Sequence, residues 1–236
     1  MRNWDKITLG KFQQIDAINE KPLSDIDKVL FSTCIVFDKT EHELDNEDPV
    51  KVVKMTEKLT KIFQTPFEPS AFPKIGKYFI NYDISKVTLG QFIELNYFMQ
   101  DKPVQHAHYI LASVSNKRWM KNKASDHRRK AEYFLTRSIA KIMGSLQQVI
   151  TNFQAFNEEY KKLFGLDKEV SGDVQEDAFN KRYGWIYSAS QIAEYERITL
   201  DEAYAMNIKH AFNDLAFLKA KGKYEVEQLK KKTPNG

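Results

Sequence analysis

The sequence has little of what marks disulfide-bonded, membrane-spanning or strongly charged proteins. Cys34 is the single cysteine among 236 residues, which excludes a disulfide framework. No run of about eighteen apolar residues occurs, and the N-terminus lacks the apolar region of a signal peptide, so we expect no membrane span. The net charge is only +4, well short of the excess typical of dedicated nucleic-acid-binding proteins. These absences predict a protein made and kept in a reducing cytoplasm.

Residues that carry chemistry form no constellation that we can assign to a reaction. His106 and His108 are two residues apart, which turns them about 200° from each other on a helix and argues against a shared metal ion. Cys34 lies in the apolar run Val29–Phe37, where a thiol is expected to be a small buried hydrophobe rather than a nucleophile. We therefore expect no catalytic residue, no cofactor and no metal site, and a protein that is not an enzyme. The other histidines are isolated among polar neighbours and are expected at the surface: His42, His127 and His210.

A regular apolar pattern is the most informative feature of the chain. Its members fall at alternating steps of four and three residues, a period of 3.5 that one face of a helix satisfies and a strand cannot. The pattern predicts one continuous helix over about 125–164, whose patterned part is on the order of 45 Å long. A helix of this length needs other helices alongside it. The nine residues of this heptad seam are Leu135, Ile139, Ile142, Leu146, Val149, Phe153, Phe156, Tyr160 and Leu163.

The residues beside the heptad seam leave two interpretations open. A free-standing coiled coil carries Glu and Lys there, whereas the segment Ile142–Asn157 has no charged residue. The seam therefore lies either in the interior of one helical bundle or in a contact with neighbouring subunits. The second interpretation predicts that Val149→Asp or Phe153→Asp disrupts a multi-subunit complex. It is favoured by uncharged polar residues on the outer face, where solvated helices usually carry Lys and Glu: Gln147, Gln148, Thr151 and Gln154.

The chain also resembles itself at an offset of 80 residues. Lys6–Phe12 (KITLGKF) recurs as Lys86–Phe92 (KVTLGQF), and Val29–Thr33 lies over Tyr109–Ser113. A duplicated helical unit explains the match, and chance similarity between short segments is the alternative.

Both copies of this segment predict the start of a helix. Thr8 and Thr88 can act as N-caps, and Gln91 completes a capping box with the second of them. Ile198–Glu202 (ITLDE) repeats the capping signal a third time. Gly10 and Gly90, which follow the first two Thr-Leu pairs, belong to these starts, since a phosphate-binding loop would need more glycines and a preceding strand.

The pattern as a whole predicts an all-α fold: a helical bundle with one long heptad-patterned helix, an internal duplication and a small C-terminal helical subdomain. The expected domains are 1–80 for the first copy, 81–165 for the second copy with the long helix, and 166–236 for the C-terminal segment. Besides the long helix, helices are expected over Leu9–Asn19, Ser24–Phe37, Pro49–Gln64, Leu89–Gln100 and Val104–Ser115.

The remaining segments are expected to connect these helices or to follow them. The acidic stretch Glu41–Asp48 and the prolines of 66–73 predict loops, and Lys77–Tyr82 predicts a short strand or extended linker. Asp167–Asp177 is polar and predicts a connecting segment, whereas Tyr183–Lys221 predicts small amphipathic helices. The lysine-rich tail over 230–236 is expected to fray.

A basic segment precedes the long helix and also has two interpretations. Cations interleaved with Trp119 and His127 can bind phosphate backbones and stack bases, and a solvated connection between helices would look much the same. If the segment binds nucleic acid, reversal of Arg128 and Arg129 to Glu should abolish binding at low salt. The candidate nucleic-acid contacts are Lys117, Arg118, Lys121, Lys123, Arg128, Arg129 and Lys130.

Several of these segments together resemble a group of phage proteins. The TLGxF helix starts, Gly184–Tyr187 (GWIY), Ile198–Glu202 and Phe212–Lys219 (FNDLAFLK) look like small proteins encoded beside the tail and head genes of phages of Bacteroidales hosts, including crAss-like phages. The resemblance implies a non-enzymatic virion component: a structural, ring or tail protein, or a cargo protein packed in the particle. A tail assembly chaperone and a nucleic-acid-binding packaging accessory are the alternatives. The implied partners are other virion proteins and copies of the chain itself, which would be made in the host cytoplasm and reside in the virion.

Overall fold

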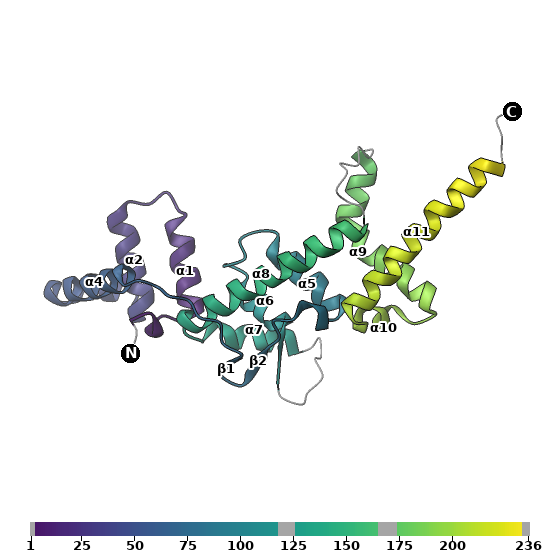
Figure 1. Ribbon diagram of the computed structural model, residues 1–236. Coiled ribbons are helices and arrows are strands. Elements are labelled where there is room, and N and C mark those ends of the chain that lie inside the picture. Colours follow the sequence, from purple (N-terminus) through teal and green to yellow (C-terminus); the bar gives the residue numbers. More distant parts are fainter. Residues whose placement is uncertain (1–2, 118–125, 165–173, 233–236) are drawn as a thin grey trace. The chain divides into compact units, whose positions relative to one another are not determined.

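The computed structural model describes residues 3–117, 126–164 and 174–232, of which 161–164, 174–182 and 232 are described by their backbone alone. The described residues are predominantly helical, with eleven α-helices and one small sheet, so the expected all-α class is confirmed (Figure 1). The chain forms two compact units: Met1–Ile80 with Phe98–Val149, and Asn81–Tyr97 with Ile150–Gly236. These units interleave along the chain, whereas the sequence suggested three consecutive domains.

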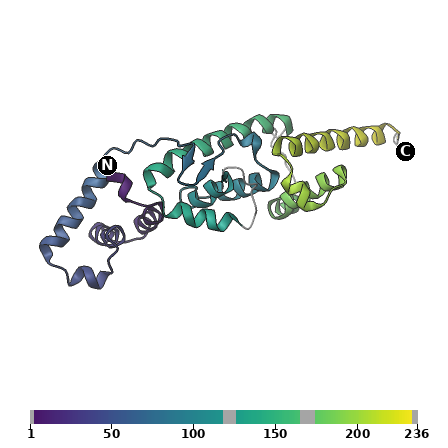
Figure 2. The same cartoon turned by 90° about the horizontal axis from the view of Figure 1, so that it is seen from below.

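The first unit opens with helices whose starts are set by polar caps. Its helical elements are η1 (Asn3–Lys6), α1 (Leu9–Asn19), α2 (Asp25–Phe37), α3 (Glu41–Asp45), α4 (Pro49–Gln64), α6 (Ala107–Ser113), α7 (His127–Leu135) and the first part of α8 (Ile139–Phe164). The side chain of Thr8 accepts the Lys11 N–H at the start of α1, as the sequence predicted, and Ser24 accepts the Asp27 N–H at the start of α2. Asp48 caps α4, which begins with a proline. Helix α1 packs on α2, and α2 packs on α4 (Figure 2).

One segment expected to be a loop contains a helix. Within the acidic stretch 41–48, α3 forms because the side chain of Thr40 accepts the Glu43 N–H and the Glu43 carboxylate accepts the Thr40 N–H at 2.7 Å. The acidic first turn also suits the positive end of the helix dipole. The prediction of a loop over 41–48 was therefore wrong for Glu41–Asp45, although the proline segment 66–73 lies outside any helix or strand, as expected.

A three-stranded antiparallel sheet belongs to the first unit. Its strands are β1 (Lys74–Ile75), β2 (Tyr78–Ile80) and β3 (Ser115–Asn116), in the order β1-β2-β3. Strand β2 confirms the extended segment predicted over 77–82. Ile75, Tyr78 and Ile80 are buried, and the Tyr78 ring lies 5.7 Å from that of Phe134 in α7. Gly76 in the β1–β2 turn has a φ of +59°, a conformation that costs glycine nothing.

The long helix expected over 125–164 is broken. Helix α7 ends at Leu135 and α8 begins at Ile139. The intervening backbone bonds instead to the segment before α1: Leu9 N–H donates to the Arg137 carbonyl, and Ile139 N–H donates to the Ile7 carbonyl, both at 2.8 Å. These groups cannot also serve a continuous helical ladder, which explains why the uninterrupted heptad pattern predicted the wrong geometry at this point.

The second unit gathers aromatic rings around Phe92. Its elements are η2 (Ile84–Lys86), α5 (Leu89–Met99, through Tyr97), the second part of α8, α9 (Val174–Glu196), α10 (Leu200–Ala205) and α11 (Ile208–Lys232). The Phe92 ring lies 5.1 Å from the rings of Phe153 and Phe212 and 5.7 Å from that of Trp185. These separations are typical of favourable aromatic pairs, so one residue of α5 joins three other helices into one core.

Two helices in the C-terminal region are longer than the small amphipathic helices expected there. Helix α9 has 23 residues and α11 has 25, and α11 includes the start of the tail expected to fray. Pairs such as Lys221 and Glu225, four residues apart with 3.9 Å between Nζ and Oε1, favour the continued helix. Within 3–117, 126–164 and 174–232, no helix combines the length and the apolar character that a membrane crossing requires.

Candidate functional site

The heptad seam is largely covered by the chain's own residues. Leu135 ends α7 and is half-buried, and the side chain of Leu163 lies outside the described residues. In the second unit, Phe153 faces Phe92, and the Tyr160 ring lies 4.9 Å from that of Phe212. The exposed fraction is 8% or less for the other seven members: Ile139, Ile142, Leu146, Val149, Phe153, Phe156 and Tyr160. The interior interpretation therefore describes their environment, and the four polar residues of the outer face are exposed.

The basic segment is only partly described, because Arg118, Lys121 and Lys123 lie outside the described residues. Three of the described members contact groups of the same chain. Arg129 pairs with Asp126 at 2.7 Å, and Arg128 pairs with Glu132 at 3.1 Å. Lys130 is buried, and its Nζ donates to the Ser115 carbonyl at 2.5 Å. The segment thus stabilises the first unit through Lys130. Arg128 and Arg129 are exposed to solvent, and Lys117 is half-buried.

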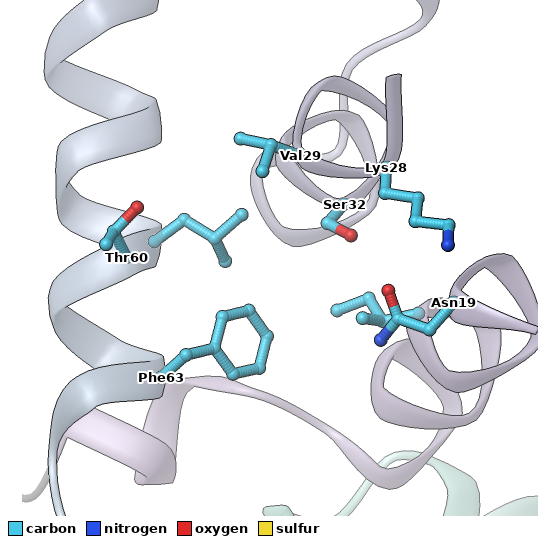
Figure 3. Close-up of a pocket in the computed structure, with 8 residues that line it drawn as sticks. Asn19, Lys28, Val29, Ser32, Thr60 and Phe63 are labelled. Atoms are coloured by element: carbon cyan, nitrogen blue, oxygen red, sulfur yellow. The ribbon is translucent and has the colours of Figure 1, made fainter. Parts of the chain in front are cut away.

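A shallow pocket in the first unit has a volume of about 160 Å³ (Figure 3). Its volume is below the range of about 300 to 1,000 Å³ that drug-sized ligands occupy. In Figure 3, the Phe63 ring and the Lys28 side chain lie on opposite sides of the pocket. The pocket lies between α1, α2 and α4 and is lined by Ile15, Asn19, Lys28, Val29, Ser32, Leu59, Thr60 and Phe63. Lys28 is the only titratable residue of this lining, so the pocket holds no acid–base pair.

A larger depression, about 540 Å³, lies in the second unit between η2, α8 and the start of α11. It is open to solvent, and its polar groups come from Asp83, Ser85, Asn152, Glu159 and Lys209. Asn152 and Ser85 already bond within the chain: Asn152 Nδ2 donates to the Tyr82 carbonyl at 2.8 Å, and Asn207 donates to the Ser85 carbonyl at 2.9 Å. The depression therefore offers few unengaged groups for a ligand.

Cys34 and His108 occupy positions where burial disfavours their charged forms. Burial raises the pKa of the Cys34 thiol, and the nearby carboxylates of Glu41 and Asp45 raise it further. Burial lowers the pKa of His108 to about 4, with smaller contributions from His106 and His127. A protonated thiol is a poor nucleophile, so Cys34 is the buried hydrophobe that the sequence predicted.

Helix α11 carries an apolar stripe that passes from the core into solvent. At the start of the helix Ile208 and Ala211 are fully buried, whereas farther along Val226 is 51% exposed and Leu229 is 65% exposed. Between them, a Cβ added at Gly222 would meet no atom within 4 Å. The members of this α11 stripe follow one another at steps of three or four residues: Ile208, Ala211, Leu215, Leu218, Gly222, Val226 and Leu229.

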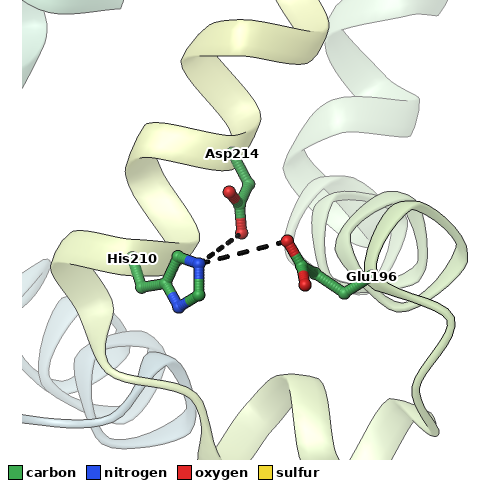
Figure 4. A group of neighbouring side chains, drawn as sticks. All are labelled: Glu196, His210 and Asp214. Atoms are coloured by element: carbon green, nitrogen blue, oxygen red, sulfur yellow. Dashed lines mark ion pairs between the residues drawn. The ribbon is translucent and has the colours of Figure 1, made fainter.

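Three titratable side chains meet where α9 ends and α11 begins (Figure 4). His210 Nε2 lies 3.7 Å from Asp214 Oδ2 and 4.0 Å from Glu196 Oε1. Asp214 is buried, with 9% of its surface exposed, Glu196 is half-buried, and His210 is exposed. Burial raises the pKa of Asp214, as does the Glu196 carboxylate, while His210 opposes the shift.

This Glu196–His210–Asp214 cluster is the group that the sequence analysis missed. His210 was expected to be an isolated surface histidine. Its position four residues before Asp214 places both on one face of α11, and this spacing is the one signal in the sequence that could have paired them. Glu196 could not have been added, because only the turn through α10 brings the end of α9 beside α11.

No protein-family model, curated protein or solved structure matches this chain.

Proposed function

We propose that this protein is a non-enzymatic component of a phage particle, and that it assembles through antiparallel pairing of α11 with α11 of a second copy. The observation that carries the proposal is the course of the α11 stripe: the face that is buried at Ile208 continues to Val226, which is half exposed beside the open surface of Gly222. The virion setting comes from the resemblance to proteins of Bacteroidales phages.

The shape of the α11 stripe suits a second helix. Gly222 and Val226 are one turn apart on the same face, so in an antiparallel pair Val226 of one copy lies over Gly222 of the other. Glycine allows close approach, and complete burial of a valine side chain contributes about 1.5 kcal/mol or more. Two such contacts occur in each symmetric pair.

The charges beside the stripe complement one another in the same arrangement. Lys221 and Lys223 flank Gly222 in the sequence, and Glu225 and Glu227 flank Val226. When two copies run antiparallel about the position of Tyr224, the lysines of one copy lie opposite the glutamates of the other. Such charges select the partner and its orientation more than they add affinity.

The heptad seam is not the assembly surface in this proposal. Val149 and Phe153 are 0% and 4% exposed, so an aspartate at either position would place an unpaired charge in the core of the chain itself. Loss of assembly in those variants would therefore report loss of folding. Substitutions in the outer half of α11 avoid this ambiguity.

The test is the concentration dependence of the molar mass in solution, measured by light scattering after size exclusion. We expect Val226→Asp to shift the protein toward the monomer without loss of helical circular dichroism. Tyr224→Asp is the matched control, because Tyr224 is 61% exposed on the opposite side of the same turn. Lys223→Glu should also weaken pairing, and the double variant Lys223→Glu/Glu225→Lys should restore it.

Two results would contradict the proposal. Weak pairs of this kind form at about 100 μM. If the wild-type chain stays monomeric at that concentration, the proposed self-pairing is ruled out. If Val226→Asp and Tyr224→Asp weaken self-association equally, the α11 stripe is not the pairing surface. Mass spectrometry of purified particles tests the virion setting separately, since a tail assembly chaperone would be missing from mature particles.

A further inference from the structure

The Glu196–His210–Asp214 cluster combines ligand atoms with a buried polar atom that is not satisfied. One ligand atom from each residue lies within 4.8 Å of the other two. Among the described residues, Asp214 Oδ2 has no hydrogen-bond partner, although this carboxylate is about nine-tenths buried and is directed at His210 Nε2. Buried polar groups in native proteins nearly always have a partner, so an orphaned carboxylate oxygen points to a ligand that completes its environment.

We propose that Glu196, His210 and Asp214 bind a divalent transition-metal ion, with zinc as the best match. An imidazole nitrogen and carboxylate oxygens are common zinc ligands, and two carboxylates neutralise the charge of the ion. Three protein ligands leave a fourth position of a tetrahedral site open to water. The site is independent of the pairing proposed for α11.

Zinc binding requires the three ligand atoms, which lie within 4.8 Å of one another, to move closer together. Tetrahedral zinc with bonds of about 2.0 to 2.2 Å holds its ligand atoms about 3.4 Å apart. The observed separations are 3.7 and 4.0 Å from His210 Nε2 to the two carboxylates. His210 and Glu196 are the more exposed members, so rotation of their side chains supplies the movement while Asp214 stays in place.

The local electrostatics also favour a cation at this point. Glu196 is the last residue of α9, where the helix dipole already presents its negative end, and the last turn of that helix contains no basic residue. The buried carboxylate of Asp214 adds a second negative charge nearby. Bound zinc would join the end of α9 to the first turns of α11, across α10.

The alternative explanation is a set of ion pairs with a protonated His210 and no bound metal. Both explanations use the same three residues, so the test must measure metal binding directly. The full-length chain, stripped of metal with a chelator, is titrated with zinc by calorimetry. Cobalt is then used as a spectroscopic probe, because a tetrahedral site gives it intense visible absorption.

We expect one zinc ion per chain, and a rise in the melting temperature when zinc is added. Glu196→Gln and Asp214→Asn should each weaken zinc binding by about tenfold or more and abolish most of the cobalt absorption. His42→Gln, a change at an exposed histidine in α3, is the matched control and should bind zinc as the wild type does.

If Asp214→Asn disturbs folding, Glu196→Gln still tests the proposed zinc site. The change removes a negative charge from the C-terminal end of a helix, so the metal-free variant should melt no lower than the metal-free wild type. It should nevertheless lose the increase in melting temperature on addition of zinc. The proposal is overturned if the wild type binds neither zinc nor cobalt, if both carboxylate variants bind zinc unchanged, or if His42→Gln loses as much affinity as they do.

Discussion

Thr8 and Ser138 form an isolated antiparallel bridge, which joins the residue before α1 to the residue before α8. The Leu9 N–H donates to the Arg137 carbonyl on one side of this bridge. Because Gly10 follows directly, the end of α7 can approach the first turn of α1: a Cβ at Gly10 would lie 3.3 Å from the Leu135 carbonyl oxygen. The TLG sequence therefore acts both as a helix start and as a docking point for a second chain segment.

The same arrangement recurs in the second unit. Thr88 bridges to Asn207, the residue before α11, and the Leu89 N–H donates to the Met206 carbonyl at 2.8 Å. A Cβ at Gly90 would lie 3.3 Å from the Tyr204 carbonyl oxygen. The duplication suggested by the sequence stays a prediction, and this recurrence gives it geometric support.

Two helical glycines should respond to alanine in opposite directions. Gly144 in α8 is buried, and an added Cβ would overlap the backbone of Ser70, so Gly144→Ala should lower the free energy of unfolding by about 2 kcal/mol or more. Gly222 in α11 has open space around its Cα, so Gly222→Ala should raise helix stability by up to about 1 kcal/mol. Chemical denaturation in dilute solution measures both changes. If both substitutions changed the free energy of unfolding by the same amount, the close contact between Gly144 and Ser70 would not determine the effect of Gly144→Ala.

His108 should make the stability of the first unit depend on pH. Its pKa is lowered to about 4 by burial, from an ordinary value of 6.5, so between these two pH values the unfolded chain binds more protons than the folded chain. The free energy of unfolding should therefore fall as the pH drops from 6.5 to 4, by up to roughly 3 kcal/mol, and level off below that range. The Gln13 amide nitrogen, a donor, lies 3.2 Å from His108 Nδ1, which favours an unprotonated ring nitrogen.

His108→Asn tests this pH dependence, because the asparagine side-chain oxygen can accept the same hydrogen bond. Urea denaturation at a series of pH values should give a flatter profile between pH 6.5 and 4 for this variant than for the wild type. His42→Asn, at an exposed position, serves as the control. Profiles of equal slope for wild type and His108→Asn would contradict the prediction.

Lys130 should stabilise the fold rather than act as a surface cation. Its Nζ donates to the Ser115 carbonyl in β3, and Lys130→Met keeps the apolar stem but leaves that buried carbonyl with one donor fewer. We expect a loss of about 1 to 3 kcal/mol in the free energy of unfolding. Arg128→Met, whose parent side chain is 89% exposed, should change it by less than about 0.5 kcal/mol. A larger effect at Arg128 than at Lys130 would refute this assignment.

Local signals in the sequence predicted much of the secondary structure. The N-caps at Thr8, Thr88 and Thr199 are present, and Thr199 forms its capping box with Glu202. These features depend on residues within one helical turn of each other, so they can be found without knowledge of the fold. The acidic helix α3 carries the same kind of signal, a threonine followed three residues later by glutamate.

Features that depend on distant residues could not be predicted in this way. An unbroken heptad pattern gives no sign that Ile7 and Leu9 will bond to the backbone of Arg137 and Ile139, and the chain forms two helices there instead of one. The Glu196–His210–Asp214 cluster could not be predicted either, because Glu196 comes from α9 and the other two residues from α11.

The sequence by itself determined that the chain is helical, where most helices start and which faces are apolar, because these properties follow from neighbouring residues and from helical periodicity. Only the tertiary structure decided which apolar faces are covered. It buried Val149 and left Val226 half exposed, although both belong to regular stripes, because burial depends on which other helices reach each face.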